Sequence, residues 1–170
     1  MSVTSPQTKP ASTPRLPEEL VASTTFLLKR LGMTAKERAM EAYEEIGLHP
    51  YHHAVLVAVD EGPHETQGAI ADRLGYDKGQ LVGLLDELEE RGFVERARDP
   101  EDRRRQLVSL TPDGKRTLRR LRSVAKQNED EFLAPLSDSD RASLHALLLR
   151  LAEKHEPRCP AAIPPPAAKT

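Results

Sequence analysis

The chain has 170 residues, a formal net charge of −2 and a single cysteine, Cys159. This length suits one ordinary domain, and one cysteine excludes an intramolecular disulfide framework and suits the reducing cytoplasm. The total charge does not predict a polyanionic partner, but the charge is unevenly spread. Between Arg91 and Arg122, eleven Lys and Arg residues occur with five acids, a local net charge of +6.

The start of the chain is rich in Pro, Ser and Thr, and its end is rich in Pro. Residues 1–16 and 156–170 therefore predict disordered tails, and no apolar segment predicts a signal peptide or a membrane span. Residues 17–155 predict one folded domain. It begins with a helical pattern over about 17–46, which Gly32 interrupts, and Gly47 suits the end of that helix.

Three further helices follow. The second runs from about Tyr51 to Glu61 with Pro50 in its first turn, and the third opens at Thr66 and stops at Gly75. The fourth begins at Asp77, which has capping-box spacing to Gln80, and ends at Gly92. Its leucines recur at helical spacing and predict one buried stripe: Leu81, Leu84, Leu85 and Leu88. Two short helices joined by a Gly-containing turn are typical of a helix-turn-helix.

The pattern then changes to strands. Residues 93–96 and 106–110 predict a β-hairpin with a long charged tip, DPEDRRR. Thr111 and Pro112 open a long helix at its N-cap and first position, and Ser137 caps a last helix with four leucines. The predicted fold class is mainly α with a small β-hairpin wing: a winged helix-turn-helix lobe plus a helical dimerisation region.

The run from Gly47 to about Leu121 resembles the MarR family of winged helix-turn-helix transcription regulators. Three segments carry the resemblance in their order and spacing: LLDELEERGFVER, DPEDRR and VSLTPDG. It implies a winged helix-turn-helix over about 48–111 and dimerisation helices over about 17–46 and 112–155. It further implies a cytoplasmic homodimeric repressor that binds a pseudo-palindromic operator in double-stranded DNA, with half-sites about one helical turn apart.

The resemblance assigns the wing arginines to DNA. Arg104 is the residue that enters the narrow, negative minor groove, and Asp102 braces it through a charge-assisted hydrogen bond. Arg103 and Arg105 are candidates for phosphate contacts. The alternative is that all three arginines form a solvated surface.

The recognition helix departs from the family pattern. Relatives usually carry Ser or Thr at the positions of Gly79, Gln80 and Val82, and often Arg at that of Gly83. Here the outward face has fewer polar side chains, so we expect sparse base readout, with Lys78, Gln80 and Val82 as candidate base contacts. The two glycines would let the helix approach DNA closely. At the start of the third helix, Thr66 and Gln67 are candidates for a phosphate contact, although Thr66 also suits simple capping.

A cluster of histidines precedes and opens the second helix. By resemblance, Tyr51, His52 and His53 lie where small phenolic or anionic effectors bind in the family, and the alternative is packing and surface. His49, His52 and His53 could also hold a metal, but their spacing is poor and we predict no metal site.

The sequence also bears on two other classes of function. A dimeric winged-helix module that binds proteins and lacks specific DNA binding is supported by the sparse recognition face and opposed by the intact wing. An enzyme is not predicted, because the sequence contains no nucleophile motif, phosphate-binding Gly loop or HExxH segment, and no cofactor is expected.

Overall fold

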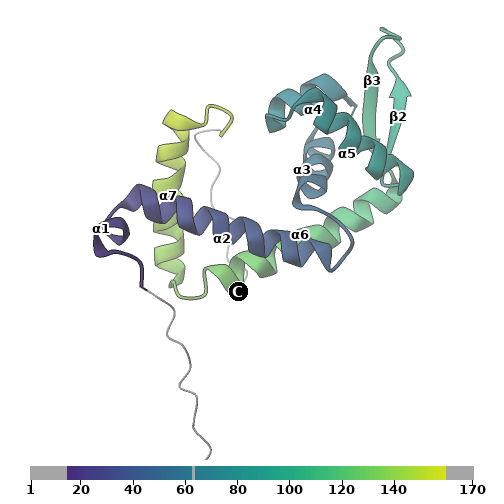
Figure 1. The fold of residues 1–170 in the computed structure, drawn as a ribbon. Helices are drawn as coiled ribbons and strands as arrows, with labels where there is room; N and C mark the ends of the chain where they lie inside the picture. The colour runs from purple at the N-terminus through teal and green to yellow at the C-terminus, as the bar shows by residue number, and fades with distance from the viewer. Residues whose placement is uncertain (1–14, 63, 160–170) are drawn as a thin grey trace, which may run out of the picture. The chain divides into compact units, whose positions relative to one another are not determined.

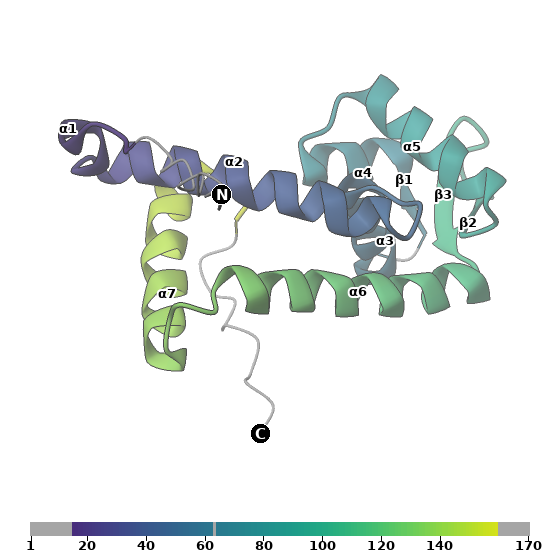
Figure 2. The ribbon, with the colours of Figure 1, turned by 60° about the horizontal axis from the view of Figure 1, so that its bottom comes forward.

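The computed structural model describes residues 15–62 and 64–159. Of the predicted tails, residues 1–16 and 156–170, only residues 15–16 and 156–159 lie within the described ranges. The described chain forms two units that divide between Lys36 and Glu37. Its elements, drawn in Figures 1 and 2, are α1 (Glu18–Val21), α2 (Thr24–Glu44), α3 (Pro50–Glu61), β1 (Glu65–Thr66), α4 (Gln67–Leu74), α5 (Lys78–Glu90), β2 (Val94–Arg98), β3 (Gln106–Leu110), α6 (Pro112–Phe132) and α7 (Asp138–His155).

The structure confirms a mainly helical chain with a small sheet. Helix α3 packs against α4, α5, α6 and β3, so it lies at the centre of the lobe (Figure 1). The stripe predicted on α5 is buried at Leu81, Leu85 and Leu88, and Leu84 packs against its edge. Each fully buried leucine stabilises the fold by about 1.5–3 kcal/mol relative to an exposed one. This stripe therefore fixes which face of α5 stays in solvent.

The sheet has one strand more than the sequence predicted. Strands β2 and β3 form the expected antiparallel hairpin, with register from Val94 opposite Leu110 to Arg98 opposite Gln106. The added strand, β1, pairs with the other edge of β3 in the order β1-β3-β2. A two-residue strand is too short to show an alternating pattern, so sequence reasoning missed it.

The base of the wing is joined to α6 by Thr111. Its backbone N–H donates to the Phe93 carbonyl at 3.1 Å, and its hydroxyl donates to the Gly92 carbonyl at 2.6 Å. The same hydroxyl accepts from the Gly114 N–H at 3.0 Å, which caps α6 as expected. The TPDG segment therefore ties the start of β2 to the first turn of α6.

The N-terminal helical region differs from its prediction. The structure breaks it between Val21 and Thr24, where the Ser23 hydroxyl accepts from the Phe26 N–H. Gly32, which was expected to interrupt the pattern, lies inside α2, a helix of 21 residues. One glycine costs a helix interior only about 1 kcal/mol relative to alanine, which is too little to break it. The prediction of an interruption at Gly32 is wrong.

None of the helices in residues 15–62 and 64–159 combines the length and apolar character that a membrane crossing needs.

Candidate nucleic-acid interface

The tip of the wing presents Arg104 to solvent on a braced loop. Asp102 accepts from the backbone N–H of Arg104 at 3.1 Å and from its Nε and Nη2 at 3.1 and 3.3 Å. These bonds hold the pKa of Asp102 below its usual value. The side chain of Arg104 is nevertheless 90% exposed. The expected ion pair between the two residues is therefore present, and it orients the guanidinium without covering it.

The neighbouring arginines differ in how they are held. The Nε of Arg105 lies 3.4 Å from the second oxygen of Asp102. Arg103 is exposed, and within the described chain no carboxylate pairs with it. Asp102 thus organises Arg104 and Arg105 together.

The outward face of α5 carries the predicted contact residues. The Asp77 carboxylate accepts from the N–H groups of Gly79 and Gln80 at 2.8 and 3.3 Å, so it caps the helix as predicted. Lys78, Gly79, Gln80, Val82 and Gly83 are all exposed. An added Cβ at Gly83 would meet nothing within 4 Å. Nothing within the described protein therefore requires a glycine at this position.

Thr66 and Gln67 lie where β1 passes into α4. The Thr66 hydroxyl accepts from the Ala69 N–H at 3.2 Å, so it caps α4. Gln67 is half-buried, and its Nε2 is buried with no hydrogen-bond partner. These two residues are therefore less available than those of α5 and the wing.

The wing and the recognition helix are tied together by Arg96 of β2. Its Nε donates to Glu89 of α5 at 3.0 Å, its Nη2 lies 2.7 Å from Asp86 of α5, and its backbone N–H donates to Glu89 at 3.2 Å. These contacts lower the pKa of Glu89, chiefly through the side-chain hydrogen bond from Arg96. The two candidate DNA-contacting elements are therefore held in a fixed relation.

The three predicted effector residues do not share one site. The ring of Tyr51 contacts those of His49 and Tyr76 in tilted and edge-to-face geometry, with centroids 4.6 and 5.5 Å away. His52 is 4% exposed, and its Nε2 bonds to Glu87 of α5 at 3.0 Å. His53 faces a cavity of about 780 Å³. Consecutive helix residues point about 100° apart, so the three side chains diverge, and only His53 of the three lines this cavity.

The cavity has an apolar wall and a few polar groups. Its apolar lining includes Ala39, Ala54, Val57 and Leu74. Tyr43 Oη and His53 Nδ1 are hydrogen-bonded at 2.6 Å, and His53 Nε2 is buried without a partner. Burial, and then the charge of Arg122, lower the pKa of His53. The ring is therefore biased toward its neutral form, with one nitrogen available to a ligand.

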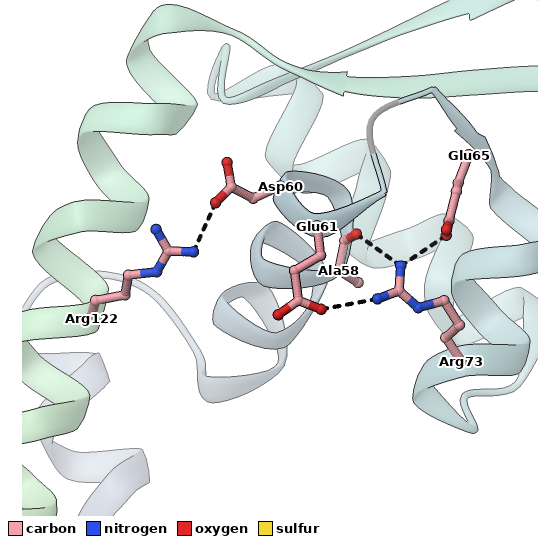
Figure 3. Close-up of polar contacts among 6 residues, drawn as sticks. All are labelled: Ala58, Asp60, Glu61, Glu65, Arg73 and Arg122. Carbon is pink, nitrogen blue, oxygen red and sulfur yellow. Dashed lines mark hydrogen bonds and ion pairs between the residues drawn. The ribbon is translucent and has the colours of Figure 1, made fainter. Parts of the chain in front are cut away.

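Arg73 of α4 also lines the cavity and holds three elements together (Figure 3). It donates to the Ala58 carbonyl and to Glu61 at the end of α3, and to Glu65 of β1, at 3.0–3.2 Å. A second pair, Arg122 with Asp60 at 2.7 Å, joins α6 to the same end of α3. Sequence reasoning missed Tyr43 and Arg73 as lining residues, because a helical pattern does not say which face meets a cavity.

Comparison with known proteins supplies the family. The family model described as MarR family matches residues 46–105. A transcriptional regulator of that family from Rhodococcus sp. RHA1 is 31% identical, and the alignment covers 75% of this chain and 91% of that one, with a TM-score of 0.67. The chain belongs to the MarR family.

Two further relatives bear on what MarR proteins do. A putative transcriptional regulatory protein for the hcr operon of Thauera aromatica is 33% identical over 62% of this chain, and the match spans 63% of that relative's length. The transcriptional repressor CouR was solved on a 23-mer DNA duplex, with 31% identity, a TM-score of 0.74, and coverage of 82% of this chain and 99% of that one. CouR from Rhodococcus jostii RHA1 was also solved with p-coumaroyl-CoA, at 30% identity, a TM-score of 0.68, and coverage of 81% and 97%. This chain is thus a relative of DNA-binding transcriptional regulators, some of which bind small molecules.

Proposed function

We propose that this MarR protein is a homodimeric repressor that binds a pseudo-palindromic operator and is released by a small-molecule effector. The observation that carries the DNA-binding part is the wing tip, where Asp102 holds a 90% exposed Arg104 in a fixed orientation. A slim hairpin that presents an arginine suits the narrow minor groove. The exposed face of α5, from Lys78 to Gly83, would lie in the adjacent major groove.

The other predicted contacts complete this proposed interface. Arg103 and Arg105 would contact phosphates beside the groove, and Gln80 and Val82 would contact base edges. Thr66 and Gln67 would lie near a phosphate at the start of α4. The lobe over about 48–111 would bind DNA, and the helices over about 17–46 and 112–155 would form the dimer.

Exposed leucines support the dimer. On α7, Leu147, Leu148 and Leu151 are 55%, 40% and 48% exposed. In residues 15–36, Leu20, Leu31 and Met33 are also exposed. Exposed large apolar side chains that gather on one helix, as on α7, mark an association site. Leu147→Glu with Leu151→Glu should convert the dimer to a monomer in sedimentation equilibrium, and an unchanged mass would exclude α7 from the interface.

The cavity at His53 is the proposed effector site. An apolar wall with a few convergent polar groups suits a small ring that carries a phenolic or anionic group. We expect p-coumaroyl-CoA, the ligand bound to CouR, to raise the Tm of the wild type and not that of His53→Ala. Equal shifts in both proteins would place the ligand elsewhere.

The experiment that tests the whole proposal is selection of bound sequences from random duplex DNA. The wild type should enrich a palindrome with half-sites about 10 bp apart, and Arg104→Ala should weaken binding to it about tenfold or more. Arg15→Ala removes the same charge from an exposed residue outside both the lobe and the proposed dimerisation helices, and is the matched control.

The second candidate is a winged-helix module that binds proteins and lacks specific DNA binding. It is favoured by the two glycines on the exposed face of α5, where polar side chains that contact the bases are expected. Selection that enriches no sequence, with weak binding equal in the wild type and Arg104→Ala, would favour this module over the repressor.

A further inference from the structure

The corner between α2 and α3, residues 45–49 with the first turn of α3, places one histidine against α5 and the next against the cavity. His49 ends the corner, where its Nδ1 accepts from the Tyr51 N–H at 3.2 Å. Its own backbone N–H donates to His52 Nδ1 at 3.2 Å, and these reciprocal bonds form a capping box. His52 and His53 therefore both belong to the first turn of α3, whose geometry depends on His52.

On one side, the corner holds the recognition helix. Among residues 15–62 and 64–159, His52 is the sole buried polar or charged residue. Its Nδ1 accepts a backbone N–H, so the ring proton lies on Nε2, which donates to Glu87 of α5. Arg91 at the end of α5 donates to the Gly47 carbonyl in the same corner. One neutral tautomer of His52 satisfies both of its contacts.

On the other side, the corner lines the cavity. Tyr43 of α2 is buried and bonds to His53 Nδ1. The opposite nitrogen, Nε2, is buried without a hydrogen-bond partner in a ring that lines the cavity. A buried polar atom without a partner is uncommon in proteins and calls for an explanation. A ligand that bonds to it would supply the missing contact.

We propose that this corner relays occupancy of the cavity to the recognition helix: a ligand bound at His53 displaces the first turn of α3, and the His52–Glu87 hydrogen bond passes the displacement to α5. This inference rests on the proposed function, because it assigns a route by which the effector would act on DNA binding. His52 and Glu87 are then positioning residues, which need not touch either ligand. The two histidines are consecutive, so neither can shift without the other.

The first test uses the free full-length protein and needs no DNA. Tyr43→Phe removes the hydroxyl that holds His53, and Tyr51→Phe removes a neighbouring hydroxyl that has no hydrogen bond in the described chain. We expect Tyr43→Phe to accelerate hydrogen exchange several-fold in peptides of α5, and Tyr51→Phe to leave them unchanged. In a Glu87→Ala background the effect of Tyr43→Phe on α5 should disappear. Equal exchange in the two Tyr variants, or an effect that persists without Glu87, would overturn the relay.

The second test asks whether Glu87 positions α5. It measures the affinity of each variant for the selected operator and for a scrambled duplex. Glu87→Ala and Glu90→Ala remove the same charge from exposed sites on α5, and in the described chain Glu90 has no partner. Glu87→Ala should weaken operator binding roughly tenfold and leave scrambled-duplex binding unchanged, because phosphate contacts tolerate a rotated helix. Glu87→Gln, which retains an acceptor, should recover most of the loss.

The outcomes separate the relay from the proposed function. Equal operator affinity in Glu87→Ala and Glu90→Ala would overturn the positioning role. A parallel loss on both duplexes would show partial unfolding and would overturn it too. If exchange in α5 responds to Tyr43→Phe but no operator is enriched, the relay stands and the repressor proposal fails.

Discussion

Gly114 lies against the carbonyl oxygen of Phe93, so closely that a Cβ at position 114 would overlap that oxygen. The contact joins the first turn of α6 to the residue before β2. Thr111, three residues before Gly114, also bonds to this strand end, through the Gly92 carbonyl. Glycine is therefore required here by a backbone neighbour, which cannot swing away as a side chain would.

Gly114→Ala should lower the free energy of unfolding by about 3 kcal/mol, because overpacking against a fixed neighbour forces the backbone apart. Gly32→Ala is the control, since an added Cβ there meets nothing within 4 Å and α2 is helical at that position. It should raise stability by about 0.5–1 kcal/mol. Urea denaturation of both variants checks the pair. Similar losses in both would show that Gly114 is not held by Phe93.

Gly83→Ala should stabilise the protein and weaken operator binding at the same time. Alanine favours a helix interior by about 1 kcal/mol over glycine, and the space around Gly83 is open in the described protein. If α5 lies deep in the major groove, the added methyl group meets DNA. Thermal unfolding and operator titration measure the two effects. Tighter or unchanged operator binding would show that this side of α5 does not approach the bases.

Arg96→Lys should loosen the wing although the charge is kept. Lysine offers one compact ammonium in place of the planar fork that reaches both Asp86 and Glu89. We expect a loss of about 1 kcal/mol in unfolding free energy and faster hydrogen exchange in β2. Arg98→Lys, also on β2 but exposed and outside any ion pair in the described chain, should change neither quantity. Indistinguishable variants would contradict a bridging role for Arg96.

Stability should fall as the solution is acidified from neutral pH through the histidine range. Burial lowers the pKa of both His52 and His53. The unfolded chain, with histidine pKa values near 6.5, therefore binds more protons in this range. The free energy of unfolding then decreases as pH falls below about 6.5, until the folded-state pKa values are passed. His53→Gln should flatten this dependence between pH 7 and 5. A slope equal to that of the wild type would mean that His53 does not titrate abnormally.

Local signals predicted much of the lobe. Asp77, Thr111 and Ser137 were predicted as helix caps, and each accepts the backbone N–H bonds that its position requires. The leucine stripe of α5 identified the buried face, because leucines that recur with the period of a helix all lie on one side of it. The pairing of Asp102 with Arg104, which the family resemblance implied, is also present.

Contacts between elements could not be predicted from the sequence. The direction of His52 and His53 depends on where α3 packs, and nothing in the run HPYHHAV distinguishes the residue that meets α5 from the one that meets the cavity. Arg73 binds partners 8 to 15 residues away on two other elements. Strand β1 exists because β3 offers it a free edge. Each of these features requires the tertiary arrangement first.

The rigid joint at Thr111 and Gly114 makes the wing an extension of α6. At 1.5 Å per residue, the 21 residues of α6 form a lever about 30 Å long. A tilt of about 6° at its distal end moves the joint by about 3 Å, close to the rise of one base pair along DNA. A change too small to alter any secondary structure is therefore large enough to carry a wing from one base-pair step to the next.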